Sequence, residues 1–233
     1  SQLIGAAFGS SGERCMALSV VVAVGDAAAD AFINKMQGKM TDLTIGVASD
    51  ASSDFGPLIT AQHKAKVVGY IDSAERDGAV VVVDGREHKV SGYESGYFVG
   101  ATLIDRVTAH MSCYQEEIFG PVLLVVRTQS MQDAMDLIDA HEYGNGTCIF
   151  TRDGEAARYF SDMINVGMVG INVPLPVPVA YHSFGGWKRS LFGDLHAYGP
   201  DSIRFYTKRK TITQRWPSAS VRENVNFSMP NLE

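Results

Sequence analysis

Residues 121–173 read PVLLVVRTQSMQDAMDLIDAHEYGNGTCIFTRDGEAARYFSDMINVGMVGINV, and this stretch decides the fold. Short apolar runs of strand length alternate in it with longer amphipathic runs of helix length. Ser130 and Asp153 stand where helix N-caps are expected, and Asp133 completes a capping box with Ser130. Strands that alternate with helices at this spacing predict an α/β layered sheet with parallel pairing. The predicted strands are residues 122–126, 147–150 and 169–173.

The same alternation extends toward the N-terminus. Thr60 is a candidate N-cap for a helix that Gly78 closes. Four apolar residues of that helix fall on one face and predict its packing side: Ala61, Ala65, Val68 and Ile71. Further apolar runs predict strands at residues 17–24, 79–83 and 102–107, and a helix is predicted at residues 26–38.

Composition excludes several classes of protein. The 233 residues carry a net charge of -6, which argues against nucleic acid as a partner because phosphate binding requires a basic surface. Apolar runs are too short for a membrane span, and no secretory signal is recognisable. Three cysteines at unrelated spacings predict reduced thiols rather than a disulfide framework. The six histidines show no paired spacing, so no metal site is predicted.

The C-terminal part of the chain has a different character. Pro174, Pro176 and Pro178 alternate with apolar residues and enforce an extended path. Residues 203–216 then alternate apolar or aromatic with basic side chains, which predicts a long exposed strand. Because an exposed edge strand invites pairing with another chain, we expect a homo-oligomer, a dimer or tetramer, formed through it. Residues 217–233 are polar, lack a period and are expected to form a tail.

The segment GSSGERCMA, residues 9–17, places Cys15 directly before a predicted strand and after a turn of small residues. A thiolate is the reactive form of cysteine, and its pKa falls beside a cation or beside backbone N–H groups. Arg14 and the tight turn could supply both. Buried, inert thiols are nevertheless common, so the local chemistry alone leaves both a nucleophile and a structural thiol open.

Five motifs in register resemble one family. GERCMALS at residues 12–19 looks like the active-site signature of the methylmalonate-semialdehyde branch of the aldehyde dehydrogenase superfamily, and EEIFGPV at 116–122 resembles the second superfamily signature. The resemblance implies a three-layer, Rossmann-like catalytic domain over residues 1–202 and an oligomerisation strand over 203–216. The remaining motifs are YGNGT at 143–147, NVP at 172–174 and SFGG at 183–186.

The resemblance also implies site residues. Cys15 matches the catalytic thiolate that attacks an aldehyde carbonyl and ends as a thioester after hydride transfer to NAD. Glu117 matches the glutamate that binds the nicotinamide ribose hydroxyls, and Phe119 the aromatic residue near the nicotinamide. Taken alone, Glu117 could belong to a solvated turn and Phe119 to ordinary core packing.

Arg14 resembles the arginine of the branch whose substrates carry a carboxylate, which a guanidinium can bind in bidentate fashion. It could instead only lower the pKa of the thiol, or face solvent. The resemblance implies a small-molecule substrate, methylmalonate or malonate semialdehyde, converted with NAD and coenzyme A to propionyl- or acetyl-coenzyme A and carbon dioxide. Four residues in matching loops are expected to give structural support around the substrate mouth: Asn145, Asn172, Phe184 and Lys188.

The chain begins at Ser1 without methionine, and its most reactive segment follows within a few residues. We therefore expect the C-terminal part of a longer protein, without the N-terminal NAD-binding domain and inactive by itself. Two rival interpretations stay open. One is a hydrolytic aldehyde dehydrogenase with its glutamate base upstream, and the other is a catalytically silent fragment that acts in assembly. A bacterial cytoplasm is the expected location, with the mitochondrial matrix as the alternative.

Overall fold

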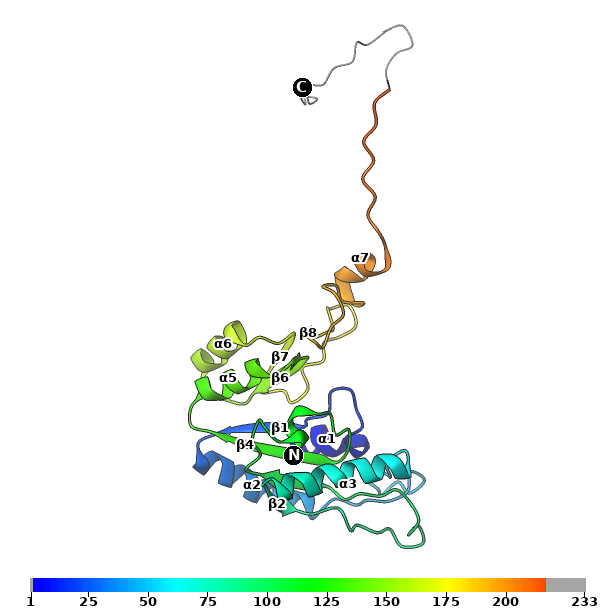
Figure 1. Cartoon of the computed structure of the whole chain (residues 1–233), viewed down its shortest axis with the longest axis vertical. Helices are drawn as coiled ribbons and strands as arrows, with labels where there is room; N and C mark the ends of the chain where they lie inside the picture. The colour runs from blue at the N-terminus through cyan, green and yellow to red at the C-terminus, as the bar shows by residue number, and fades with distance from the viewer. Residues whose placement is uncertain (1, 217–233) are drawn as a thin grey trace.

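A computed structural model of the chain describes residues 2–216, so the tail predicted at 217–233 lies outside the described residues. The centre of the molecule is a sheet of four strands in the order β1-β4-β3-β2 (Figure 1). The pairs β1–β4 and β4–β3 are parallel, as predicted, whereas β2 is antiparallel to β3. The strands are β1 (Val20–Val24), β2 (Val80–Val83), β3 (Thr102–Asp105) and β4 (Val122–Thr128).

The antiparallel edge strand has a topological cause. Parallel neighbours need a crossover connection, usually a helix. The segment that joins β2 to β3 contains no helix, and it folds back on itself where the Gly100 N–H donates to the Gly85 carbonyl at 2.8 Å. Parallel pairing was predicted for strands that alternate with helices, and β2 and β3 are not joined in that way.

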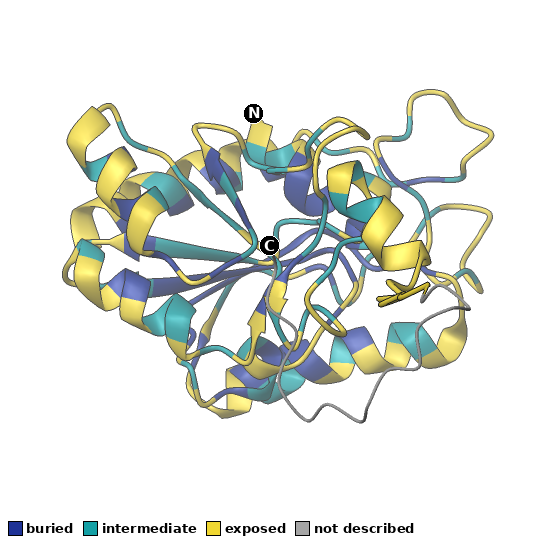
Figure 2. Ribbon diagram, turned by 90° about the horizontal axis from the view of Figure 1, so that it is seen from above, coloured by how far each residue is buried: buried dark blue, intermediate teal, exposed yellow. Residues whose placement is uncertain are grey.

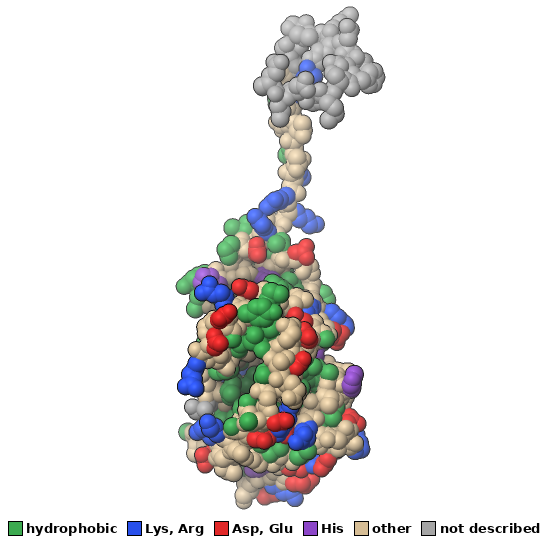
Figure 3. Space-filling view, turned by 90° about the vertical axis from the view of Figure 1, so that its left-hand side faces the viewer, with side chains coloured by type: hydrophobic (Ala, Val, Ile, Leu, Met, Phe, Trp, Pro, Cys, Tyr) green, Lys and Arg blue, Asp and Glu red, His purple; other side chains and the backbone are tan. Residues whose placement is uncertain are grey.

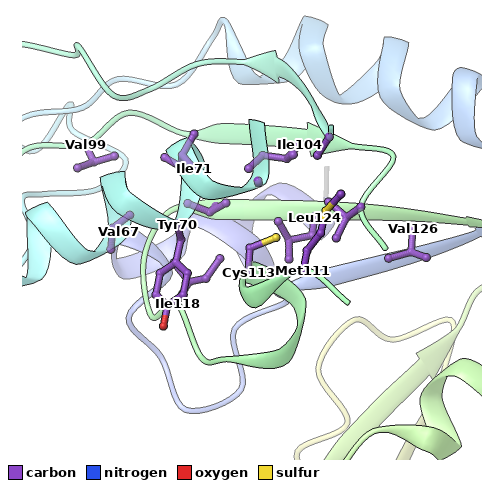
Figure 4. Packing of buried hydrophobic residues seen from close by; sticks show 14 of the residues in the cluster. Val67, Tyr70, Ile71, Val99, Ile104, Met111, Cys113, Ile118, Leu124 and Val126 are labelled. Carbon is purple, nitrogen blue, oxygen red and sulfur yellow. The ribbon is translucent and has the colours of Figure 1, made fainter. Parts of the chain in front are cut away.

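Helices cover both faces of the sheet and make three layers, as predicted (Figure 2). Side chains along β4 alternate between the faces because a strand has a period of two. Leu124 packs with the cluster under α3, whereas Leu123 packs with the cluster under α2. Figure 4 shows Val67, Tyr70 and Ile71 over the strand residues Ile104 and Leu124. The covering helices are α1 (Gln2–Phe8), α2 (Asp26–Met40), α3 (Ala61–Arg76) and α4 (Ser112–Gln115).

Helix α3 begins as predicted, since the Thr60 hydroxyl accepts from the His63 N–H at 3.1 Å. Its predicted packing face is only partly right. Ala61 and Ala65 are exposed, and the fully buried residues are Val67, Tyr70, Ile71 and Ala74. The larger Val67 and Tyr70 bury more apolar surface than the two alanines would, so the helix is rotated toward them.

A smaller unit lies beside the edge of β1 and is also parallel. Strands β6 (Gly146–Ile149) and β7 (Met168–Ile171) pair there, covered by α5 (Met131–Ala140) and α6 (Gly154–Met163) (Figure 1). Both predicted caps are confirmed. Ser130 and Asp133 form the reciprocal capping box of α5, and Asp153 accepts from two N–H groups at the start of α6. Four buried residues form the core of this unit: Met135, Phe160, Ile164 and Val166.

The prediction of a strand at residues 203–216 is wrong for its first residues, which form a helix. After the short pair β5 (Tyr143–Gly144) and β8 (Trp187–Lys188), the turn η2 (Gly199–Asp201) leads into α7 (Ser202–Tyr206). Pro200, in the first turn of this helical segment, has the φ that a helix start needs. Residues 207–216 are exposed, leave the body of the molecule and pair with no strand in the described part of the chain (Figures 1 and 3).

Two kinds of feature are absent from residues 2–216. No helix there has the length and apolar character that a membrane crossing needs. No group of three or more His, Cys, Asp or Glu side chains there is placed to hold a metal ion.

Arg127 on β4 ties the sheet to α2. It donates to both carboxylate oxygens of Asp105, at 3.0 and 2.8 Å, and to Asp26 and Asp30 at 2.9 and 2.7 Å. The Asp105 side chain is 7% exposed, so it needs this cation. Burial raises the pKa of the Asp105 carboxyl, but the bonds from Arg127 and the nearby positive charges outweigh it and hold the pKa below its ordinary value.

We expect Arg127→Met to lower the free energy of unfolding by about 3–5 kcal/mol at neutral pH, because Asp105 is then buried without its partner. The lowered pKa of Asp105 makes its contribution present above the unfolded-state pKa and lost in acid. The difference in free energy of unfolding between the parent and the variant should therefore become smaller as the pH falls toward about 4. Urea unfolding at both pH values measures this, with the exposed Arg158→Met as control. A deficit that does not depend on pH would contradict the assignment.

Candidate active site

The sheet topology brings the predicted site residues together. Cys15 lies shortly before β1, and Glu117 and Phe119 lie shortly before β4. Because β1 and β4 are parallel neighbours, their N-terminal ends lie side by side, and the segments that lead into them meet at this edge of the sheet. A cavity of about 60 Å³ at this edge is lined by all four predicted residues, Arg14, Cys15, Glu117 and Phe119.

The turn before Cys15 has an unusual backbone. Ser10, Ser11 and Gly12 all have left-handed φ values, of 52°, 59° and 70°. The buried Ser11 hydroxyl donates to the Gly56 carbonyl at 2.7 Å and holds the turn against a distant loop. A Cβ on Gly12 would lie 2.1 Å from the carbonyl oxygen of Gly120. Only glycine at position 12 therefore lets this turn approach the segment that carries Glu117 and Phe119.

Arg14 is exposed and is oriented by the same turn. Its Nε donates to the Ser10 hydroxyl at 3.1 Å. Its guanidinium lies against Gly9, where a Cβ would come within 2.7 Å of Nη1. No carboxylate in residues 2–216 forms an ion pair with Arg14. The side chain is thus held in place while its terminal nitrogens remain available to a ligand.

Cys15 is the exposed cysteine among the three, whereas Cys113 is buried and Cys148 is half-buried. Burial raises the pKa of both Cys113 and Cys148 to about 11. The backbone N–H of Cys15 has no acceptor in the described part of the chain. An accessible thiol beside a free N–H is an arrangement that suits a nucleophile, because the N–H can stabilise an oxyanion formed at the sulfur.

Glu117 and Phe119 flank a buried anchor. Ile118 is 7% exposed and packs in the core, so its two neighbours project from the surface of the molecule. The Glu117 carboxylate has no hydrogen-bond partner in residues 2–216. Phe119 is 37% exposed and has a φ of 56°. The structure thus leaves a free carboxylate next to an exposed aromatic ring, and the ribose-binding and nicotinamide-packing roles of the two residues stay predictions.

A second, larger cavity of about 670 Å³ has Cys15 in its wall as well. It lies between β1 and residues 144–150, and Pro174 and Pro176 also line it. Asn145 reaches into this wall, where its Nδ2 donates to the sulfur of Met16 at 2.9 Å. Cys15 therefore lines two cavities whose other residues differ.

The other three residues expected to give support do so away from the cavities. Lys188 donates from Nζ to three carbonyls at the C-terminal end of α5, which a cation stabilises. Asn172 makes two hydrogen bonds to the backbone of Thr151. Phe184 packs edge to face against Tyr198.

Sequence reasoning missed Glu13 and His63. The Glu13 carboxylate lies 3.3 Å from Nε2 of His63, and this nitrogen is 2.6 Å from the carbonyl oxygen of Phe119. The sequence signal that could have found them is weak. His63, Lys66 and Tyr70 form a polar stripe beside the buried face of α3, and nothing in the sequence states what the stripe contacts.

The fold and the site define the class of protein. Residues 1–212 match the aldehyde dehydrogenase family, and the chain belongs to this family. It is 64% identical over 232 residues to malonate-semialdehyde dehydrogenase of Pseudomonas aeruginosa, a match that covers 100% of this chain and 47% of that protein. The chain thus spans about half the length of the relatives it matches.

Solved structures agree with this class. A methylmalonate-semialdehyde dehydrogenase from Oceanimonas doudoroffii superposes with a TM-score of 0.88 at 76% identity, over 95% of this chain and 46% of that one. An aldehyde dehydrogenase of Mycobacterium tuberculosis complexed with NAD+ superposes with a TM-score of 0.81 at 28% identity, over 90% of this chain and 42% of that one. The Rossmann-like α/β architecture predicted from the sequence is that of these neighbours.

We expect iodoacetamide at neutral pH to alkylate Cys15 at least about tenfold faster than Cys113 or Cys148, because only a thiolate reacts and burial disfavours it at the other two positions. Peptide mass mapping over a time course measures the three rates. Cys15→Ser is the control that should remove the fast phase. Equal rates at all three cysteines would contradict the selective reactivity of Cys15.

Proposed function

We propose that this chain forms the catalytic part of an NAD-dependent, coenzyme A-acylating dehydrogenase of malonate-type semialdehydes. The observation that carries the proposal is the meeting of Arg14 and Cys15 with Glu117 and Phe119 at one cavity. The names of the relatives, malonate- and methylmalonate-semialdehyde dehydrogenase, support the substrate class. Because those relatives are about twice as long, the activity is proposed for the natural protein that contains this chain.

Cys15 is the proposed nucleophile. Its thiolate attacks the aldehyde carbon, and the carbonyl oxygen takes up the electron pair as a thiohemiacetal oxyanion. The backbone N–H of Cys15, which has no acceptor within residues 2–216, is proposed to donate to that oxygen. When the carbonyl re-forms, the aldehyde carbon loses its hydride and remains bound to Cys15 as a thioester.

Two residues at the smaller cavity have the chemistry that suits the nicotinamide riboside part of NAD. The free carboxylate of Glu117 can accept two hydrogen bonds from a ribose diol, and the exposed ring of Phe119 offers an apolar surface to the nicotinamide. The chemistry that NAD supplies when bound is acceptance of the hydride. The larger cavity, lined by Asn145, Pro174 and Pro176, is the proposed side of aldehyde entry, because Cys15 lines it as well.

Arg14 is proposed to bind the carboxylate of the semialdehyde. Loss of that carboxylate as carbon dioxide leaves an electron pair on the neighbouring carbon, which the thioester carbonyl stabilises until a proton is taken up. The thiol of coenzyme A then attacks the thioester carbon and displaces the Cys15 thiolate. The role of coenzyme A rests on the resemblance to this branch of the family.

We expect the natural protein, supplied with NAD, malonate semialdehyde and coenzyme A, to form acetyl-coenzyme A and carbon dioxide with NADH in equal amounts. Chromatography of the products with an NADH assay measures this, and Cys15→Ala is the inactive control. Free acid as the product in the presence of coenzyme A would instead indicate the hydrolytic reaction and would contradict the proposal.

We expect Arg14→Leu to reduce kcat/KM for malonate semialdehyde by about 10- to 100-fold, the usual cost of a lost charge-assisted hydrogen bond. Propanal, which carries no carboxylate, should be oxidised nearly as fast as by the parent protein. Steady-state rates on both aldehydes measure the difference, with the exposed Arg152→Leu as a matched control. Equal losses on both substrates would show that Arg14 does not recognise the carboxylate.

A further inference from the structure

Helix α3 holds the loop of residues 116–120 from one side. Nζ of Lys66 donates to the Glu117 carbonyl at 3.3 Å, and the Tyr70 hydroxyl donates to the Glu116 carboxylate at 2.6 Å. Burial and the bond to Glu116 raise the pKa of Tyr70 to about 12, so the phenol keeps its proton. A Cβ on Gly120 would lie 2.7 Å from Cγ2 of Val67, so the loop also packs directly on the helix.

His63, one turn earlier on the same helix, contacts both segments of the site. Its Nε2 lies 2.6 Å from the carbonyl oxygen of Phe119, and its ring meets the Phe119 ring edge to face, with 6.4 Å between centroids. The acceptor is a carbonyl, so Nε2 is the protonated nitrogen of the ring. Phe119 has a left-handed φ of 56°, which a non-glycine residue adopts only when its surroundings hold it there.

The same nitrogen reaches the segment that carries the nucleophile. Oε1 of Glu13 lies 3.3 Å from Nε2 of His63, and the Glu13 side chain is only 10% exposed. This oxygen is buried and has no aligned hydrogen bond, because the His63 N–H points to Phe119. A buried carboxylate oxygen is costly without a nearby donor, so Glu13 draws His63 toward the turn that ends in Arg14 and Cys15.

We propose that His63 is a positioning residue that sets the distance between Cys15 and the Glu117–Phe119 pair, by placing Nε2 between the Phe119 carbonyl and the Glu13 carboxylate. This proposal rests on the proposed function. The turn of residues 9–15 and the loop of residues 116–120 approach each other closely at Gly12, where a Cβ would lie 2.1 Å from the Gly120 carbonyl oxygen. His63 adds a polar group that touches both segments, at hydrogen-bond distance from the Phe119 carbonyl and 3.3 Å from the Glu13 carboxylate.

The test uses the natural protein with His63→Leu, and His63→Gln as the conservative variant whose amide can donate to the Phe119 carbonyl. We expect His63→Leu to raise the Kd for NAD and lower kcat for the semialdehyde, each by roughly tenfold, because small displacements of reacting groups are costly. We expect His63→Gln to recover both to within about threefold of the parent. Gln62→Leu, on the exposed side of the same turn, is the matched control.

A double-mutant cycle with Glu13 tests whether His63 acts by connecting the two segments or only within the segment that carries Phe119. In a Glu13→Gln background, His63→Leu should lower kcat/KM by clearly less than it does alone, since half of the link is already gone. Multiplicative effects, or a His63→Leu protein with parent kcat and Kd for NAD, would overturn the proposal. If His63→Leu does not fold, His63→Asn takes its place in the cycle, because its shorter amide cannot span the two partners.

Failure of the proposed function would look different. A parent protein that binds NAD but oxidises no semialdehyde would contradict the proposed reaction. The Kd for NAD and the alkylation rate of Cys15 by iodoacetamide, measured across the same cycle, would still decide the role of His63. Coupling in both quantities supports the positioning role, and its absence in both contradicts it.

Discussion

The parallel pairing of β1 with β4 is the constraint on which the site depends. It brings two segments that are about a hundred residues apart in the sequence to one edge of the sheet, the turn before β1 and the loop before β4. The pairing alone would leave them separated by their side chains. Gly12 removes that obstacle, because a Cβ at this position would overlap the Gly120 carbonyl. The backbone geometry thus forms the cavity, and Arg14, Cys15, Glu117 and Phe119 lie in its wall because they belong to these two segments.

The same geometry places Cys15 in the walls of two cavities. Cys15 faces the Glu117 and Phe119 side through the smaller cavity and the Asn145 side through the larger one. A thiol at such a junction can meet two different molecules without either having to pass the other. Arg14, held by Ser10 and Gly9 on the same turn, adds a fixed positive charge at the smaller cavity.

Local rules explain which parts of the structure could be predicted. The caps at Thr60, Ser130 and Asp153 involve residues two or three positions apart, so their spacing in the sequence was sufficient. The site residues were found by motif, and the structure gathers them. The direction of β2, the packing face of α3, and the contact of Glu13 with His63 depend on segments far apart in the chain. No pattern within one segment contains that information, and the alternation at 203–206 was equally compatible with the helix that forms there.

The exposed segment after α7 has a consequence for the lifetime of the polypeptide. Residues 207–216 leave the body in an irregular, solvent-exposed path (Figure 3). Lys208, Arg209 and Lys210 follow one another near the start of this segment. Proteases of trypsin-like specificity bind an extended backbone and cleave after basic residues, and exposed terminal segments are where such nicking concentrates. Any surface that covers this segment therefore also shields the chain from cleavage.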